Sequence, residues 1–286
     1  MYNAIKTGVD AYVLRDSFAW KLEELAPDIL GQADDIGLAA LDKWDAGDYS
    51  GAKESADKAL FAYETIDTGL AAYEARQSVV WGLEALAPEF LWQTDDVALA
   101  ALDKWDAEDY NGAKEGADKA LLMYSALKIG VEAYQLREEI ALDAVKIDPT
   151  TFWSMDDIGW GAIDKWIAED YEGAKADAET AMFGYTVTGA AVQRQRALDA
   201  RADVAVRQEF NAAQAIYDQA NRALPSQSFD EALRLYRESL NMFRQVARTA
   251  DERRRIAEEA LRRAQQRLAE SNETARNADA ILEGGR

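Results

Sequence analysis

Apolar residues recur along most of the chain at the three- and four-residue intervals that place them on one face of a helix. One such stripe follows Pro27 and has spacings of 4, 3, 4 and 4; it consists of Ile29, Ala33, Ile36, Ala40 and Trp44. Because proline is favoured in the first turn of a helix, the pattern predicts a short amphipathic helix over residues 28–46.

A second stripe starts at Tyr49 and runs to Tyr73 with spacings that alternate between 3 and 4. It crosses Gly69 without a change of phase, and a single glycine costs a helix only about 1 kcal/mol. Asp48 precedes the stripe and is suited to cap a helix. We therefore expect one helix over residues 49–86, about 57 Å long at 1.5 Å per residue.

The whole pattern returns with a 61-residue period. Residues 8–68 and 69–129 are identical at 36 of 61 positions without a gap, and residues 130–190 keep the same landmarks. Self-similarity at a fixed period is the signature of a repeat protein. The recurring landmarks are Pro27, Pro88 and Pro149; Trp44, Trp105 and Trp166; Tyr49, Tyr110 and Tyr171; and Tyr63, Tyr124 and Tyr185.

This period divides the chain into consecutive segments. We expect the end of a preceding repeat at 1–7, full repeats at 8–68, 69–129 and 130–190, a degenerate fourth repeat at 191–250, and a helical tail rich in Arg, Glu and Ala at 251–286. Tyr2 is in register with Tyr63, so the chain begins inside the last helix of a repeat. This favours a fragment excised from a longer protein, with a natural half-repeat cap as the alternative.

The predicted fold class is all-α: tandem 61-residue helical repeats, each with a short helix and a long shared helix, followed by a long C-terminal helix. A short helix covers only half of a long one. The repeats can therefore form a spectrin-like rod of three-helix bundles, about 100 Å long. Alternatively, the long helices bend near Gly69 and Gly130 into a tetratricopeptide-like solenoid.

The composition narrows the chemistry. The chain has 286 residues, no cysteine, no histidine and a formal net charge of −21. The missing residue types exclude disulfides, Cys/His zinc sites and catalysis by Cys or His. No apolar run approaches the roughly 18 residues of a membrane span, so we expect no membrane insertion by this segment.

The charge is uneven along the chain. Residues 1–193 carry 38 acidic and 15 basic residues, a balance of −23, whereas residues 194–286 carry 15 acidic and 17 basic residues, a balance of +2. An acidic array repels phosphate backbones, so we expect no nucleic-acid partner.

The residues from Trp44 to Tyr49, followed by Ala52, Ala56 and Ala59, resemble the second half of a tetratricopeptide motif. The run from Ala26 to Leu30, together with the Asp-Tyr and Ala-Leu positions that follow, more closely resembles Ala-rich helical repeats of bacterial envelope proteins, often spirochaete lipoproteins. In the third copy, Asp148-Pro149 departs from the Ala-Pro pattern of that family. The resemblance implies a periplasmic or envelope scaffold, peptidoglycan-associated in the full-length protein, and no defined activity.

Two acidic patterns are candidates for chemistry. Asp42, Asp45 and Asp48 lack the order of an EF-hand loop, so we interpret them as a helix end and an N-cap. The doublet Asp34-Asp35, which recurs at 95–96 and 156–157, points its two side chains about 100° apart on a helix. We interpret it as a surface pattern. We therefore expect no catalytic residue, no cofactor and no metal site, and hence no enzyme.

The aromatic residues divide into two groups. The Trp44, Tyr49 and Tyr63 series lie on the predicted buried stripe and are expected in the core. Trp92, Trp153 and Trp160 lie off that stripe, and Leu99 occupies the place of Trp160 in the second copy. We favour packing of these side chains against a further layer of the same chain. The alternative is an exposed patch that binds a partner, another copy of the chain or a glycan.

The C-terminal tail carries a cluster of arginines interleaved with glutamates. Apolar residues keep a 3/4 spacing from Phe243 to Leu268, which predicts a long helix with coiled-coil character. The arginines are suited to an acidic surface, such as the repeats of another copy. They are Arg253, Arg254, Arg255, Arg262 and Arg263.

The sequence thus predicts a non-catalytic scaffold, spacer or protein-interaction module that self-assembles or binds a protein partner. The alternative function is a module that binds a glycan or peptide through Trp92, Trp153 and Trp160.

Overall fold

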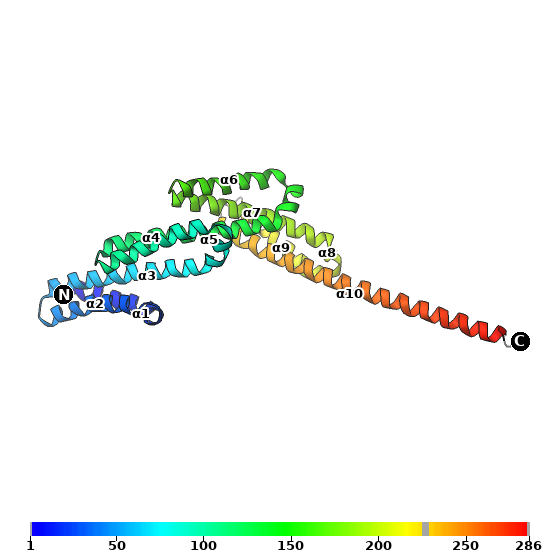
Figure 1. Ribbon diagram of the computed structural model, residues 1–286, viewed down its shortest axis with the longest axis horizontal. Helices are drawn as coiled ribbons and strands as arrows, with labels where there is room; N and C mark the ends of the chain where they lie inside the picture. The colour runs from blue at the N-terminus through cyan, green and yellow to red at the C-terminus, as the bar shows by residue number, and fades with distance from the viewer. Residues whose placement is uncertain (1, 225–228, 285–286) are drawn as a thin grey trace. The chain divides into compact units, whose positions relative to one another are not determined.

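The computed structural model describes residues 2–224 and 229–284, and the backbone of this part is almost entirely helical (Figure 1). No strand occurs among these residues, and the last helix is the longest. The predicted all-α class with a long C-terminal helix is confirmed.

Short and long helices alternate along the first two thirds of the chain. The predicted helix over 49–86 is confirmed, and the predicted short helix over 28–46 lies at 27–45. The short helices begin at Pro27, Pro88 and Pro149, one repeat period apart. The helices are α1 (Tyr2–Leu25), α2 (Pro27–Asp45), α3 (Tyr49–Leu86), α4 (Pro88–Asp106), α5 (Tyr110–Ile147), α6 (Pro149–Ile167), α7 (Tyr171–Asp199), α8 (Ala202–Ala205), α9 (Arg207–Ala223) and α10 (Phe229–Gly284).

Local chemistry explains where the long helices start. The carboxylate of Asp48 accepts a hydrogen bond from the backbone N–H of Gly51 at 2.9 Å, as expected of an N-cap. Asp109 and Asp170 make the same bond in the next two copies. The acidic turn is therefore a capping element, as its sequence predicts.

The chain divides into two compact units, which we describe separately. The first comprises residues up to Tyr134 together with Ile158–Glu179, and the second comprises Gln135–Asp157 together with residues from Thr180 onward. In the first unit, α1 and α2 pack side by side on α3 (Figure 1). One core forms around Phe18, Leu22 and Tyr63.

The second unit contains α8, α9 and the first half of α10, which share an aromatic core. Phe210 and Tyr217 of α9 contact Phe243 of α10, with ring centroids 5.6 and 6.2 Å apart. Beyond α8 and α9, α10 continues as a single helix (Figure 1). Its residues 251–277 are all exposed.

The predicted burial of the aromatic landmarks holds for Tyr63, Tyr124 and Tyr185 and for Trp105 and Trp166, but it is wrong for Trp44 and Tyr49. Trp44 is only partly buried and Tyr49 is exposed. The reason lies in what covers them. Trp105 is covered by the α1–α2 turn of the copy before it, and within the described residues no such turn packs against Trp44.

Candidate interaction site

An ion-paired network holds the three helices of the first repeat together. Arg15 of α1 donates from Nε and Nη2 to the two carboxylate oxygens of Asp34 on α2, both at 2.6 Å. The hydroxyl of Tyr63 on α3 donates to the same carboxylate at 2.8 Å. Bidentate pairing of this kind fixes geometry as well as charge, so the network sets the positions of three helices at once.

The network recurs in the next two copies of the repeat. Arg76 pairs with Asp95 at 2.8 and 2.7 Å, and Tyr124 donates to that carboxylate. In the second unit, the corresponding residues are Arg137, Asp156 and Tyr185, with donor–acceptor distances of 2.6 to 2.8 Å.

These contacts fix the protonation of the groups. The hydrogen bond from Arg15 lowers the pKa of Asp34 below its usual value. Burial acts to raise the pKa of Asp95, but the hydrogen bonds from Arg76 and Tyr124 outweigh it and the pKa is lowered. Burial, together with the neighbouring carboxylate, raises the pKa of Tyr63. At neutral pH the carboxylates are ionised and the phenols protonated, which suits a structural role.

The interpretation of the Asp-Asp doublets as a surface pattern is therefore wrong for the first residue of each doublet. Asp34 and Asp95 are partly buried and Asp156 is buried, whereas the second aspartate of each doublet stays exposed. The sequence did contain a signal for this. Arg15, Arg76 and Arg137 are the only arginines before Arg194, and each precedes its aspartate by the same 19 positions.

Beside the second network lies an apolar groove with a volume of about 570 Å³. One wall is the second half of α3, the other is α4, and the floor is the first half of α5, while the α1–α2 turn closes one end with Leu22, Leu25, Ala26 and Ile29. The floor consists largely of alanines on α5, whose small side chains leave the space between the two walls unfilled. The apolar side chains that line it include Ile66, Leu70, Tyr73, Leu99, Leu102 and Ala117.

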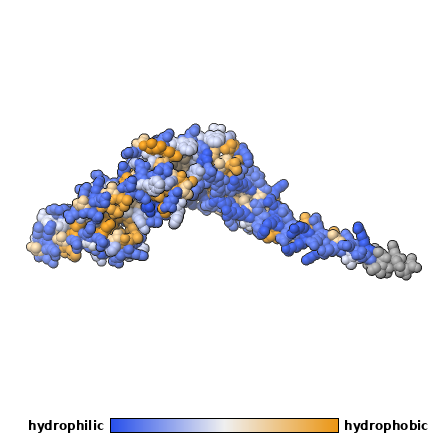
Figure 2. All heavy atoms as spheres, in the orientation of Figure 1, coloured by the Kyte–Doolittle hydropathy of each residue, from blue (hydrophilic) through white to orange (hydrophobic). Residues whose placement is uncertain are grey.

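The first repeat has the same groove, with a volume of about 660 Å³. Each of those six lining positions has its counterpart one repeat period earlier: Ile5, Val9, Tyr12, Leu38, Leu41 and Ala56. Ile5, Val9, Tyr12, Leu38 and Leu41 are all exposed. Figure 2 shows hydrophobic residues gathered on the visible face of the N-terminal helices. The groove is thus a property of the repeat.

A small residue keeps each groove open. Gly37 and Ala98 occupy equivalent positions on α2 and α4, and both line a groove. In α9 of the second unit, Tyr217 stands at the matching position, three residues after Gln214 as Gly37 stands three residues after Asp34. Its ring packs against Tyr236 and Phe243, with centroids 5.8 and 6.2 Å away. A large ring at this place therefore contributes to a filled core.

The off-stripe tryptophans lie at the surface. Trp92, Trp153 and Trp160 are 63%, 52% and 64% exposed, so the favoured explanation, packing against a further layer of the chain, is wrong. The short helices turn this face away from the long helices they cover. Leu99, the counterpart of Trp160, is exposed at the groove wall, whereas Trp92 does not line the groove. The structure thus brings Leu99, but not Trp92, to the groove.

The arginines of the tail are mostly paired within their own helix. Arg254 lies 2.8 Å from Asp251, Arg255 pairs with Glu252, and Arg263 pairs with Glu259. Arg253 instead donates to the carbonyl oxygen of Ala205 at 2.6 Å. Three of the five arginines thus lie beside a carboxylate of their own helix, which offsets part of their positive charge, and such exposed pairs contribute little stability.

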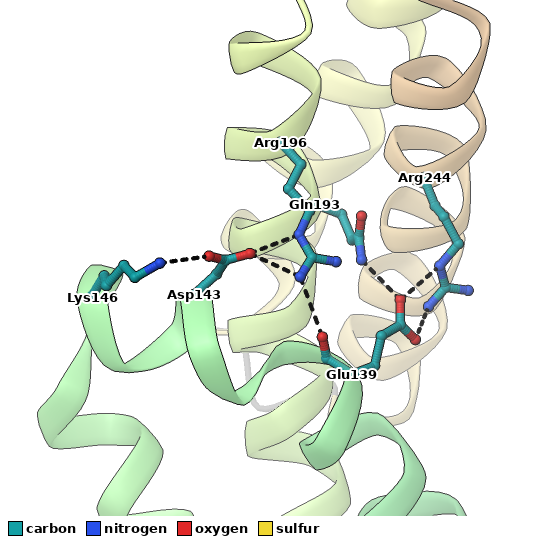
Figure 3. Close-up of polar contacts among 6 residues, drawn as sticks. All are labelled: Glu139, Asp143, Lys146, Gln193, Arg196 and Arg244. Atoms are coloured by element: carbon teal, nitrogen blue, oxygen red, sulfur yellow. Dashed lines mark hydrogen bonds and ion pairs between the residues drawn. The ribbon is translucent and has the colours of Figure 1, made fainter. Parts of the chain in front are cut away.

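A polar cluster in the second unit was not foreseen from the sequence (Figure 3). Glu139 on α5 accepts from Arg244 of α10 at 2.7 Å and from Gln193 of α7 at 2.9 Å. One turn later, Asp143 accepts from Arg196 at 2.9 Å. The earlier copies have serine at the place of Glu139, and Lys21 or Gly82 at the place of Asp143. The change to carboxylates coincides with the change to an arginine-rich sequence.

Within the described ranges, no group of three or more acidic side chains is placed to hold a metal ion. None of the described helices combines the length and the apolarity that a membrane span requires. Comparisons with protein-family models and with curated protein sequences find no match to this chain. The resemblance to envelope repeat proteins therefore stays a prediction.

Proposed function

We propose that this chain is a non-catalytic helical scaffold that binds an amphipathic helix of a protein partner in its repeated grooves. The observation that carries the proposal is the same apolar groove at the same place in two successive repeats. A feature that only one repeat showed would be easy to attribute to local sequence variation.

The shape of the groove suits a helix. The three helices of each repeat line it, and in the second repeat the α1–α2 turn closes one end, so a helix added along the open part would complete a four-helix arrangement with its apolar stripe buried. Tyr73, Leu99 and Leu102 are all exposed along it and would be covered by such a partner. An amphipathic helix presents apolar residues at intervals of three and four, which matches a groove that runs between helices.

The charge of the repeats favours a basic partner. Residues 1–193 carry a balance of −23, which attracts a helix with lysines or arginines on its polar face. The resemblance to envelope repeat proteins extends the proposal to location: a scaffold in a bacterial envelope, with peptidoglycan association in the full-length protein. Binding of a glycan through Trp92, Trp153 and Trp160 is the second candidate, since all three side chains are exposed.

A defined peptide tests the groove. The probe is a helical peptide of about 22 residues with leucines on one face and lysines elsewhere. We expect binding in the micromolar range by calorimetry. A peptide of the same composition without the stripe, and one with glutamates in place of lysines, should bind at least about tenfold more weakly.

Matched variants locate the site. Leu38→Asp with Leu99→Asp places a charge in each groove and should reduce binding at least about tenfold. Trp81→Asp with Leu142→Asp changes two exposed apolar residues outside both grooves and should leave binding unchanged. If both double variants bind the peptide as the unmodified chain does, the groove is not the site and the proposal is wrong.

A further inference from the structure

The junction between the first and second repeats has a defined chemistry. The turn between α1 and α2 presents Leu22, Ala26 and Ile29 to a core that includes Ile66 and Leu70 of α3. The indole N–H of Trp105 donates to the side-chain oxygen of Gln32 at 2.6 Å, which joins the two repeats by a polar contact. Ile66 and Leu70 are 5% and 8% exposed.

The next junction repeats this arrangement. Leu83 and Phe90 occupy the places of Leu22 and Ile29, and the ring of Phe90 lies 5.6 Å from that of Trp166. Trp166 donates to Gln93 at 2.9 Å. Two junctions with the same contacts define what this repeat requires of its neighbour: an apolar turn and one glutamine.

At the N-terminal face of the first repeat, the residues that would receive such a turn are present, but within the described residues no turn covers them. Ile5 and Val9 hold the places of Ile66 and Leu70, yet they are 49% and 54% exposed. Trp44 and Tyr49 complete the face, and neither makes a side-chain hydrogen bond within the described residues. This apolar face matches the faces that receive a neighbouring turn at the two junctions inside the chain.

We propose that this face, formed by Ile5, Val9, Trp44 and Tyr49, is a docking surface for one more repeat of the same kind. The occupant would present apolar residues at the places of Leu22, Ala26 and Ile29, and a glutamine at the place of Gln32. The proposal follows from continuity with the two junctions inside the chain. Ile5, Val9 and Trp44 also line the groove of the first repeat, so a docked repeat and a bound helix would compete for this groove.

The third repeat of a second copy of this chain does not have the residues that this docking surface requires. There, Asp148 replaces the alanine, Thr151 replaces the isoleucine and Ser154 replaces the glutamine. A carboxylate would be buried against apolar side chains without a partner, which is costly. Simple head-to-tail association of copies through their third repeats is therefore disfavoured.

Because the chain has no cysteine, the modification rate of a single introduced thiol can be measured without interference. A second copy of residues 2–62 is placed directly before Tyr2, which keeps the 61-residue register, and Val9→Cys supplies the only thiol. The rate of thiol modification then reports whether the face is covered. Leu70→Cys in the unextended chain is the buried reference, and Val13→Cys, which is 63% exposed, is the open reference.

We expect the added repeat to slow modification of Val9→Cys at least about tenfold, toward the rate of Leu70→Cys. Modification of Val13→Cys should not change. Helix content measured by circular dichroism should rise in proportion to the added length. Ile29→Asp with Gln32→Ala, placed only in the added copy, should restore fast modification of Val9→Cys.

Two results would overturn the proposal. One is an added repeat that is helical while Val9→Cys remains as reactive as Val13→Cys. The other is an added repeat that gains no helix content, because a face built to receive this repeat should stabilise it.

Discussion

The third copy of the repeat and the predicted degenerate fourth copy solve the same packing problem in two ways, with residues that all lie in the second unit. In the third copy Arg137 pairs with Asp156, and Tyr185 donates to the same carboxylate 29 residues later. In the fourth copy Arg194 donates to Gln214 at 2.6 Å, and the residue 29 positions after Gln214 is Phe243. The carboxylate and the hydroxyl have been replaced together.

This paired change has a physical reason. A buried hydroxyl needs an acceptor and a buried carboxylate needs donors, so the loss of either alone leaves the other without a partner. Among the described side chains, no buried polar atom lacks a hydrogen-bond partner. The first three copies therefore depend on ionised groups, whereas the fourth depends on aromatic packing, with Tyr217 at the place where Gly37 or Ala98 keeps a groove open.

The largest effect is expected from removing the aromatic core of the fourth copy. Phe243 is fully buried, and Phe243→Ala should lower the free energy of unfolding by about 3–5 kcal/mol. Leu261 lies on the same helical stripe but is 60% exposed, so Leu261→Ala should cost no more than about 0.5 kcal/mol. Urea denaturation measures both. Equal costs would show that the stripe is covered along its whole length.

The next largest loss of stability is expected from disrupting the ion-paired network of the third copy. Asp156→Gln removes the carboxylate that Arg137 and Tyr185 share. Arg137 retains Glu138 and Tyr185 has a weaker acceptor, so unfolding should become easier by about 2–4 kcal/mol. The control is Asp157→Gln on the exposed neighbour, with an expected cost below about 0.5 kcal/mol. Similar costs at both positions would mean that the network contributes nothing specific.

Converting the network of the third copy to that of the fourth tests whether the aspartate and the tyrosine depend on each other. Tyr185→Phe alone should cost about 1 kcal/mol, because it removes one hydrogen bond. Combined with Asp156→Gln, it should cost less than the sum of the two single changes, by about 1 kcal/mol or more. Additive costs in a double-mutant cycle would contradict the idea that the two groups are replaced as a pair.

The smallest effects are the responses to pH. Because the folded-state pKa values of Asp34, Asp95 and Asp156 are lowered, their stabilisation is present above the unfolded pKa near 3.9 and is lost as pH falls through the lower folded values. Burial raises the pKa of Tyr185, so its contribution is complete below about pH 10 and is lost at higher pH.

Urea midpoints measured from about pH 3 to pH 11 should therefore decrease at both ends. The double variant Asp156→Gln with Tyr185→Phe carries the neutral form of the network in its third copy. Its midpoint should depend less on pH at both extremes than that of the unmodified chain. An unchanged profile would assign the pH dependence to other groups.

Much of the fold is readable from local pattern. The stripe over residues 49–86 predicts the long helix because side-chain periodicity and capping by Asp48 act within a few residues. The positions of Trp105 and Trp166 on the apolar stripe of the short helices likewise predict their burial. Trp44 has the same local sequence, but its exposure depends on whether another repeat packs against it, which no local pattern contains.

The geometry of the candidate site could not be predicted from local pattern. Asp34 and Asp35 are neighbours of identical chemistry, and only the rotation of α2 against α1 and α3 decides which of them reaches Arg15 and Tyr63. The groove likewise depends on small residues from three separate segments that meet in space. Its place beside Asp95 could not be read from any one of them.

The helices, their 61-residue period, their caps and the division between an acidic array and an arginine-rich end can be predicted from the sequence, because each is set by spacing and composition along the chain. Only the folded structure shows which aspartate carries the ion pair, where the grooves open and which apolar face stays uncovered. These depend on how helices from distant segments are rotated and packed against one another, and on which neighbour is there to cover each side chain.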